Sequence, residues 1–224
     1  MKSATRSVGR MIKSLSVEMD SSSQRPHAWM NLCWGRMKKI KDQTKSMSCQ
    51  RIFIAYGGNL SGPAGTPRAT FEAARRLLAR RGICVVAGSQ LYESDPWGGV
   101  RQPKFLNGVW EVRSPYAPQV LMDHLLNVEW VLGRRRRLRW GPRVLDLDLL
   151  SFGEVRGSWQ ETEGLPAVML PHPRMHLRAF VLEPLADIAP AFRPWGSAGP
   201  TVGEALHGLA LPERSATRCV RLSL

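Results

Sequence analysis

Two aspartates separated by one leucine are the strongest chemical signal in the sequence. Asp146 and Asp148 lie in an apolar run whose alternation predicts a strand, so both carboxylates are expected on one face of it. They would be about 6.6 Å apart and would repel each other by about 2.5 kcal/mol at an effective dielectric constant of about 20. One or two magnesium ions would offset this repulsion, as in phosphoryl-transfer sites. Taken alone, such a pair is more often two solvated aspartates.

Six arginines precede these aspartates within ten residues, just after a glycine that is expected to end a helix. They are Arg134, Arg135, Arg136, Arg137, Arg139 and Arg143. Guanidinium groups bind phosphate oxygens bidentately and stay charged at any working pH, so a polyphosphate is a suitable ligand. A run of this kind is also typical of a solvated or nucleic-acid-attracting surface. Its position beside the aspartates favours a site with metal on one side and phosphate on the other.

Other side chains could bind a phosphate or a flat ring. His172 lies between Pro171 and Pro173, which restrict its backbone, and a rigidly held imidazole can donate a hydrogen bond to a phosphate. Four aromatic and amide residues could sandwich a heterocycle and recognise its edge, namely Trp97, Phe105, Asn107 and Phe180. Each of these, taken singly, is more often part of a core. The glycines at 57, 58 and 62 match neither common phosphate-binding motif, so they predict a strand-ending turn.

Composition limits the class of protein but does not identify it. The 224 residues are 43% hydrophobic, which is enough for a core, and 32 basic against 18 acidic residues give a net charge of +14. This charge predicts a polyanionic partner without distinguishing nucleic acid from nucleotide or an acidic membrane surface. The sequence contains no apolar run of about 18 residues that would predict a membrane helix. Its four cysteines form no CxxC pair, so reduced thiols in a cytosol-like compartment are expected.

Residues 1–50 differ from the rest of the chain. They hold six lysines, whereas Lys104 is the only later one, and they contain six of the nine methionines. We expect a basic, disordered leader followed by a domain over 51–210 and a tail over 211–224. The leader is either a tail or the product of a start codon placed too far upstream. A third reading is an organelle transit peptide, which would replace the cytoplasmic location that is otherwise expected.

The elements that must position the candidate site alternate along the chain. Strands are predicted at 52–56, 83–92, 105–112 and 144–152. One helix begins with Thr66 as N-cap and ends at Gly82, and a second runs from Pro118 to Gly133. The order β-α-β-β-α-β predicts an α+β fold with a ferredoxin-like antiparallel sheet covered by helices, forming a single catalytic domain. Short helices are expected near 178–188 and 201–208.

Several segments together resemble a known enzyme family. They are Phe105-Leu106-Asn107, Glu129 with Leu132-Gly133-Arg134, Arg139-Trp140-Gly141-Pro142-Arg143, Asp146-Leu147-Asp148-Leu149, Pro171-His172-Pro173-Arg174 and Arg178-Ala179-Phe180-Val181-Leu182-Glu183-Pro184-Leu185. In this order they look like the 6-hydroxymethyl-7,8-dihydropterin pyrophosphokinase family of folate biosynthesis. The resemblance runs from about Ile52 to Pro190 and weakly on to Leu209, and it does not include the leader.

The resemblance implies transfer of the β,γ-pyrophosphoryl unit of ATP to the pterin hydroxymethyl oxygen, with two Mg²⁺ ions and AMP as product. By motif match, both metals would be held by Asp146 and Asp148. The phosphates would be bound by Arg134, Arg136, Arg139, Arg143 and His172. Groups around the nucleotide would include Glu129, Leu149 and Arg178. The pterin would contact Asn107 and lie between Phe105 and Phe180, with Ser94, Asp95 and Trp97 in the adjoining loop.

The sequence departs from the family at a few positions. Leu126 stands where glutamine is frequent, and Asp95 stands where a small residue or proline is common. The arginine loop is one residue shorter than in some relatives, so the sequence does not decide which of Arg135, Arg136 and Arg137 reaches phosphate. No metal ligand is lost, and an active enzyme is therefore expected.

Two other classes of function remain open at this stage. The arginine loop could make the chain a basic nucleic-acid-binding module, although the adjoining aspartates would repel phosphate unless metal intervened. The chain could also be an inert relative that keeps the fold for interaction. The expected partners are ATP and the pterin, with no membrane and no nucleic acid, and the next enzyme of the folate pathway is a further candidate.

Overall fold

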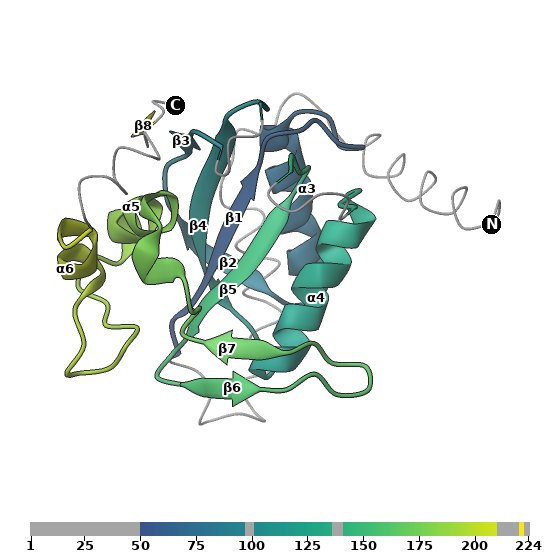
Figure 1. Ribbon diagram of the computed structural model, residues 1–224. Coiled ribbons are helices and arrows are strands. Elements are labelled where there is room, and N and C mark those ends of the chain that lie inside the picture. The colour runs from purple at the N-terminus through teal and green to yellow at the C-terminus, as the bar shows by residue number, and fades with distance from the viewer. Residues whose placement is uncertain (1–49, 97–100, 136–140, 210–219, 222–224) are drawn as a thin grey trace.

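The computed structural model describes residues 50–96, 101–135 and 141–209, together with the backbone of residues 220–221. Its centre is a six-stranded antiparallel sheet (Figure 1). The strands are β1 (Ile52–Gly58), β2 (Cys84–Gly88), β3 (Tyr92–Ser94), β4 (Phe105–Arg113), β5 (Asp146–Phe152) and β8 (Val220–Arg221). They follow the order β5-β1-β4-β3-β8, and β2 also pairs with β4. This sheet and the order of its elements confirm the ferredoxin-like α+β fold predicted from the sequence.

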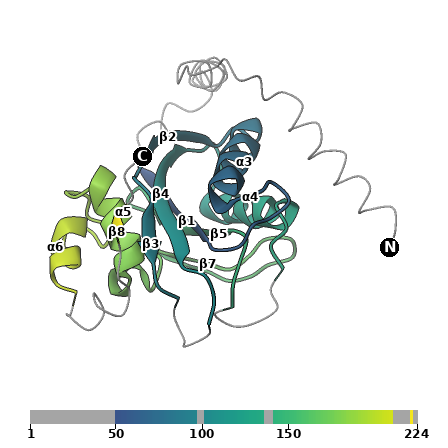
Figure 2. The ribbon, with the colours of Figure 1, turned by 90° about the horizontal axis from the view of Figure 1, so that it is seen from above.

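Two helices cover one face of the sheet (Figure 2). They are α3 (Pro67–Arg80) and α4 (Pro118–Val131). The Thr66 hydroxyl caps α3 by accepting a hydrogen bond from the Ala69 N–H. Each helix is followed by a glycine with a positive φ, +81° at Gly82 and +96° at Gly133, which is a backbone conformation that favours glycine. The caps and ends predicted from the sequence are confirmed.

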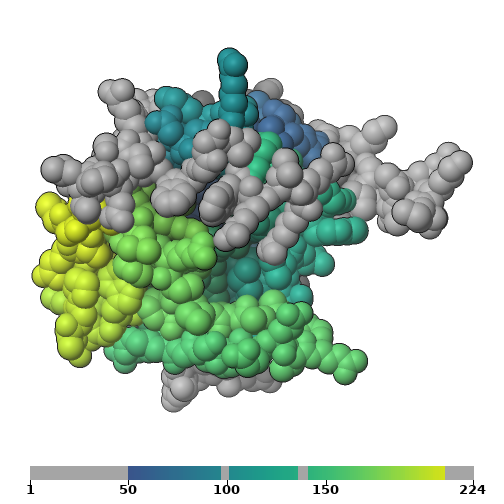
Figure 3. Space-filling view, viewed as in Figure 1, coloured from purple at the N-terminus to yellow at the C-terminus, as the bar shows by residue number. Residues whose placement is uncertain are grey.

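The chain that follows β5 first forms a hairpin of β6 (Gly157–Trp159) and β7 (Val168–Leu170), whose Val168 and Leu170 pack into the core beneath α3 and α4. The 3-10 helix η1 (Met175–Leu177) and the helices α5 (Ala179–Ile188) and α6 (Val202–His207) come next, and α5 and α6 cover the opposite face of the sheet (Figure 1). In the space-filling view, α6, α5 and this hairpin lie next to one another on the visible face (Figure 3). The hairpin was not predicted from the sequence, because each of its strands has only three residues.

The sheet separates two hydrophobic cores. Alternate residues of β1 point to opposite sides, so Ile52 and Ile54 belong to the core beneath α3 and α4, while Phe53 belongs to the core beneath α5 and α6. The middle of each core is fully buried, with Leu125 and Leu182 at 0% exposure. Because both faces of the sheet are covered, the strands that carry the candidate site have little freedom to shift.

The predicted strand over 83–92 is wrong as one continuous element. The structure divides it into β2 and β3, which pair with different parts of β4. A register shift falls between Val85 and Ala87. Beyond it, the Ser89 hydroxyl accepts the Val109 N–H at 2.9 Å, in place of a backbone carbonyl. The side chain therefore interrupts the backbone ladder, an effect that requires the partner strand to be in place.

Several predictions fall on residues outside the described ranges. They concern the leader up to residue 49, most of the tail over 211–224, and the side chains of Trp97, Arg136, Arg137 and Arg139. Among the described residues, no helix is both long enough and apolar enough to cross a bilayer.

Candidate active site

The two aspartates lie on one face of β5, as the alternation predicts. Leu147 and Leu149 are buried in the core beneath α4, whereas the side chains of Asp146 and Asp148 are 22% and 34% exposed. Both carboxylates line a cavity of about 830 Å³ on the opposite face of the sheet. Enclosure and the neighbouring Asp146 carboxylate raise the pKa of Asp148 to about 6. The repulsion expected within the pair is the second cause of this shift, after burial.

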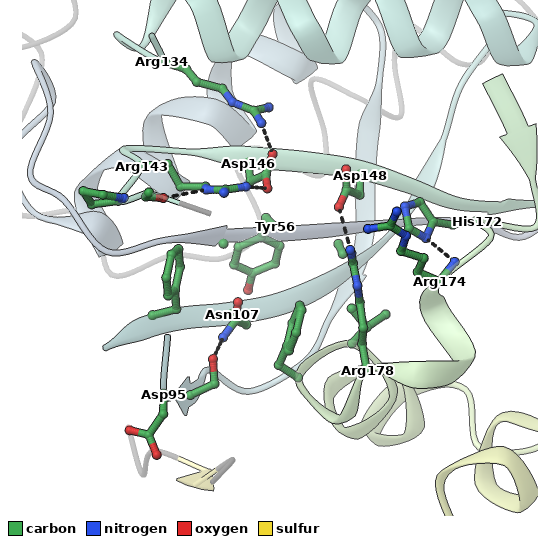
Figure 4. Close-up of a pocket in the computed structure, with 18 of the residues that line it drawn as sticks. Tyr56, Asp95, Asn107, Arg134, Arg143, Asp146, Asp148, His172, Arg174 and Arg178 are labelled. Carbon is green, nitrogen blue, oxygen red and sulfur yellow. Dashed lines mark hydrogen bonds and ion pairs between the residues drawn. The ribbon is translucent and has the colours of Figure 1, made fainter. Parts of the chain in front are cut away.

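Three arginines approach these carboxylates (Figure 4). Arg134 Nη2 lies 2.6 Å from Asp146 Oδ1, and Arg143 Nη1 lies 2.6 Å from Asp146 Oδ2. Both oxygens of Asp146 are therefore paired with guanidinium groups. Arg178 Nη1 lies 3.8 Å from Asp148 Oδ2, which is a looser contact. All three arginines line the cavity, so the structure brings together the cationic and anionic groups that the sequence places side by side.

The end of α4 determines where Arg134 lies. The Gly133 N–H donates to the Trp130 carbonyl, and the Arg134 N–H donates to the Glu129 carbonyl, which is the hydrogen-bond pattern of a Schellman motif. Arg135, the next residue, also lines the cavity, and its guanidinium stacks on the Trp130 ring at 5.3 Å from its centroid. The glycine signal in the sequence thus positions the first arginine of the run.

Arg143 is held by a residue that the sequence analysis treated only as part of a turn. The Asn59 side chain accepts the Arg143 N–H at 2.8 Å, and the Asn59 N–H donates to the Arg143 carbonyl at 2.9 Å. The end of β1 and the segment before β5 approach each other closely here. A β-carbon at Gly58 would lie only 2.4 Å from the Val144 carbonyl oxygen. The asparagine that follows two glycines was the only local signal for this contact.

Glu129 lies beneath the cavity and not in its lining. Its side chain is 2% exposed, forms an ion pair with Arg134, and accepts the Leu147 N–H at 2.6 Å. Burial raises the pKa of Glu129 to about 7, although Arg134 acts in the opposite direction. Leu149, also expected near the nucleotide, is a core residue that reaches only a second, smaller pocket.

His172 lines the cavity as a neutral imidazole. Its Nδ1 accepts the Arg174 N–H at 3.2 Å, so the tautomer that fits this contact carries its proton on Nε2. Burial, together with the positive charges of Arg178 and Arg174, lowers the pKa of His172 to about 4. The ring is therefore uncharged at neutral pH and has an N–H group left to donate.

The residues expected around a heterocycle gather at the other side of the same cavity. Asn107 is 7% exposed and donates to the Ser94 hydroxyl at 2.8 Å. Asp95, Phe105 and Phe180 line the cavity with them. The Arg143 guanidinium carbon lies 5.9 Å from the Phe105 centroid, and that of Arg178 lies 5.6 Å from the Phe180 centroid. Each of these arginines thus contacts both an aspartate and an aromatic ring.

A second pocket of about 310 Å³ adjoins the first and shares Asp148 and His172 with it. Its remaining wall is largely the β6–β7 hairpin, with Trp159 and Met169, together with Met122 of α4. Sequence reasoning missed this part of the site because the hairpin itself was not predicted. Within the described ranges, no cluster of three or more His, Cys, Asp or Glu residues could hold a metal ion by itself. Two carboxylates on one strand face could supply part of the ligand set of a divalent cation, with phosphate oxygens supplying the rest.

Comparison with known proteins places this chain in a family. Residues 53–190 match the family model described as 7,8-dihydro-6-hydroxymethylpterin-pyrophosphokinase (HPPK). The chain is 46% identical over 144 residues to 2-amino-4-hydroxy-6-hydroxymethyldihydropteridine pyrophosphokinase of Pseudomonas aeruginosa, covering 64% of this chain and 83% of that protein. It is 38% identical over 137 residues to the folate synthesis bifunctional protein, mitochondrial, of Arabidopsis thaliana, covering 61% of this chain and 23% of that protein.

The fold is also similar to that of solved structures. A crystal structure of wild-type Plasmodium falciparum HPPK-DHPS with SDX-DHP matches with a TM-score of 0.54 at 13% identity, covering 71% of this chain and 43% of that one. The chain thus spans less than half of that longer protein. The likeness supports the ferredoxin-like fold, and the family model together with the curated relatives supports the function. The chain belongs to the HPPK family, whose activity is ATP-dependent pyrophosphoryl transfer to hydroxymethyldihydropterin in folate biosynthesis.

Proposed function

We propose that the cavity between β5, β4 and α5 is the site of this pyrophosphoryl transfer and that the reaction there depends on Mg²⁺. The observation that carries the proposal is the convergence of unlike groups in one cavity. Paired carboxylates, five arginines, a neutral histidine, a buried amide and two phenylalanines line it together. This combination suits a reaction between a metal-bound polyphosphate and a flat polar ring.

The arginines and His172 are assigned to the triphosphate. Arg134 and Arg143 lie on the Asp146 side of the cavity and Arg178 on the Asp148 side, so a polyphosphate laid along β5 would meet cations at both ends. His172 would donate a neutral hydrogen bond through Nε2. These groups would hold the β-phosphorus in line with the pterin hydroxymethyl oxygen, and they would neutralise charge as AMP leaves.

Magnesium fits the donor set of this site. Asp146 and Asp148 supply hard oxygen ligands from one strand face, and the missing ligands are those that phosphates provide. We assign both Mg²⁺ ions of the family mechanism to this pair. When bound there, the ions would neutralise part of the phosphate charge.

The two ends of the substrates are assigned to the two pockets. The smaller pocket would take the nucleotide base, because it opens beside Asp148 and His172 and has an apolar wall with Met169 and Leu149. The pterin ring would lie at the opposite end, between Phe105 and Phe180, with its edge hydrogen-bonded to Asn107.

The direct test is AMP formation from ATP and 6-hydroxymethyl-7,8-dihydropterin, measured with Mg²⁺ and after its removal by EDTA. Asp146→Ala and Asp148→Ala are each expected to abolish turnover while the melting transition stays cooperative, because each deletes a metal ligand. Asp123→Ala, an exposed position on α4, is the matched control and should keep full activity. Unchanged activity in either site variant would contradict the metal assignment.

The described arginines of the run argue against the nucleic-acid alternative. The described arginines of the run are turned into the cavity or stacked on Trp130, and two of the cavity arginines are paired with Asp146. Binding of RNA or DNA that survives EDTA and falls steeply with salt would revive that reading. A chain that binds ATP and pterin without forming AMP would point to the inert relative.

We also propose that the chain acts beside the next enzyme of folate synthesis. Support comes from the names of the Arabidopsis bifunctional protein and the Plasmodium HPPK-DHPS chain, in which this domain is part of a longer protein. Co-purification with that enzyme tests the association. Import of a reporter fused to residues 1–50 into an organelle would decide between the cytoplasmic and the organelle location.

A further inference from the structure

One buried carboxylate connects helix α4 to both halves of the aspartate pair. Glu129 Oε1 accepts the N–H of Leu147 at 2.6 Å, and Leu147 is the residue between Asp146 and Asp148. In the described sheet β5 is the terminal strand and pairs only with β1. The Leu147 N–H thus lacks a neighbouring strand, and a side chain from α4 takes the place of that strand. This contact fixes the position of β5 relative to α4 at the residue that lies between the two aspartates.

The same carboxylate also fixes an arginine. Glu129 Oε1 is ion-paired with Arg134 Nη1, while the other terminal nitrogen of Arg134 reaches Asp146 Oδ1 at 2.6 Å. The backbone adds a further tie, because the Arg134 N–H donates to the Glu129 carbonyl at 2.9 Å. Arg134 is therefore held at both its backbone and its guanidinium by one residue that substrates cannot reach, since Glu129 is 2% exposed and does not line the cavity.

We propose that Glu129 is a positioning residue, which acts on the reaction through Arg134 and through the spacing of Asp146 and Asp148, and not a ligand of the nucleotide. The inference rests on the proposed function, because it assumes that Arg134 binds the phosphates of ATP. It replaces the expectation, drawn from the family resemblance, that Glu129 lies around the nucleotide. A buried ion pair of this kind costs desolvation, and its benefit lies in holding a charged group in one place.

The decisive variant is Glu129→Gln. The amide oxygen can still accept the Leu147 N–H, and the size is unchanged, but the attraction for Arg134 is lost. We expect kcat to fall at least tenfold while the dissociation constant of a non-hydrolysable ATP analogue changes less than threefold. Arg134→Met should reduce kcat further, and the double variant should be no slower than Arg134→Met alone, because both changes act through one guanidinium.

The matched control is Glu111→Gln. Glu111 is 8% exposed and paired with Arg51 at 2.7 Å, so it is a second carboxylate of low exposure with an arginine partner, on β4 and away from the cavity. It should lower the melting temperature to a similar extent and leave kcat unchanged. If Glu129→Gln behaves in the same way, Glu129 is merely structural and the proposal is overturned.

Direct nucleotide binding would give a different result. In that case Glu129→Gln would weaken binding of the ATP analogue by the same factor by which it lowers kcat/KM. If the contact were with the ribose 2′-hydroxyl, this loss of affinity would be smaller for the 2′-deoxy form of the analogue. Should the wild-type protein form no AMP at all, the proposed function fails, but the positioning role is still decided by NMR. The side-chain Nε–H signal of Arg134 should shift and broaden in Glu129→Gln and not in Glu111→Gln, and an unchanged signal would overturn the proposal.

Discussion

The surroundings of the His172 ring make the stability of the protein depend on pH. Its folded-state pKa of about 4 lies below the ordinary value of 6.5, so the unfolded chain takes up a proton first as the pH falls. The stabilisation is fully present above pH 6.5 and is lost as the pH falls towards 4. We expect this loss to be about 2 kcal/mol, after allowance for partial exposure.

Urea unfolding at pH 7, 5.5 and 4.5 measures this pH dependence. In His172→Gln the stability should decline less over that range, because the titrating ring is gone. His176→Gln changes an exposed histidine of η1 and should follow the wild type. Parallel declines in the wild type and in His172→Gln would show that other groups cause the acid sensitivity.

Asn107 is expected to govern recognition of the pterin edge. It is nearly buried, and its amide nitrogen is already bonded to Ser94, which leaves the oxygen and one N–H in a fixed orientation. Asn107→Ala should weaken pterin binding by about 1–3 kcal/mol and spare ATP. Calorimetry with each ligand separately checks this, and an equal loss for ATP would mark the residue as structural.

Signals close together in the sequence predicted much of this chemistry. Alternation alone predicted that Asp146 and Asp148 share a face. The contact of Asn59 with Arg143 joins positions 84 residues apart, and that of Glu129 with Leu147 joins positions 18 residues apart. Neither can be read from local pattern, because each depends on how the elements pack.

Among the secondary-structure elements, we expect the end of α4 to affect the reaction and the end of α3 not to affect it. Gly82 and Gly133 have similar positive φ angles, so alanine at either position should cost about 1 kcal/mol of stability. A β-carbon at Gly133 would in addition lie 2.9 Å from Pro63 Cδ, whereas one at Gly82 would meet no atom within 4 Å.

The pair of variants separates stability from catalysis. Gly133→Ala should lower both the melting temperature and kcat, because Arg134 follows directly and would be displaced. Gly82→Ala should lower only the melting temperature. Equal kcat in the two variants would show that the Schellman turn does not position Arg134.

The secondary-structure elements also show which features could not be predicted from local sequence patterns. Thr66, Pro67 and Pro118 predicted the starts of both long helices, because caps are local chemistry. The break between β2 and β3 depends on a serine hydroxyl meeting a strand 20 residues away, and the β6–β7 hairpin is held by Gln119 of α4, which donates to the carbonyls of Gln160 and Pro166. Such tertiary contacts overrode the local signal.

At the scale of the whole molecule, the domain is expected to fold without its leader. Arg51 is the first side chain with an ion pair in the described residues, bonded to Glu111 at 2.7 Å, and Gln50 accepts a bond from Arg113. A chain beginning at Met47 should melt cooperatively at the wild-type temperature. One beginning at Phe53 loses both contacts and should be less stable by about 1–3 kcal/mol. Loss of cooperative melting in the longer chain would place the leader within the domain.

Because both Asp146 oxygens are paired with arginines, a metal ion that binds Asp146 must exchange with a guanidinium group. A divalent cation reaches this carboxylate only by displacing a guanidinium, and a displaced guanidinium needs an anion to receive it. Free Mn²⁺, used as a paramagnetic probe, should therefore bind weakly alone and at least tenfold more tightly with a non-hydrolysable ATP analogue. Arg143→Met should bind Mn²⁺ alone more tightly than the wild type does, while binding the analogue less well. We therefore expect metal and nucleotide to enter as one neutralising unit, so that a cell's free magnesium would not fill the site ahead of its substrate.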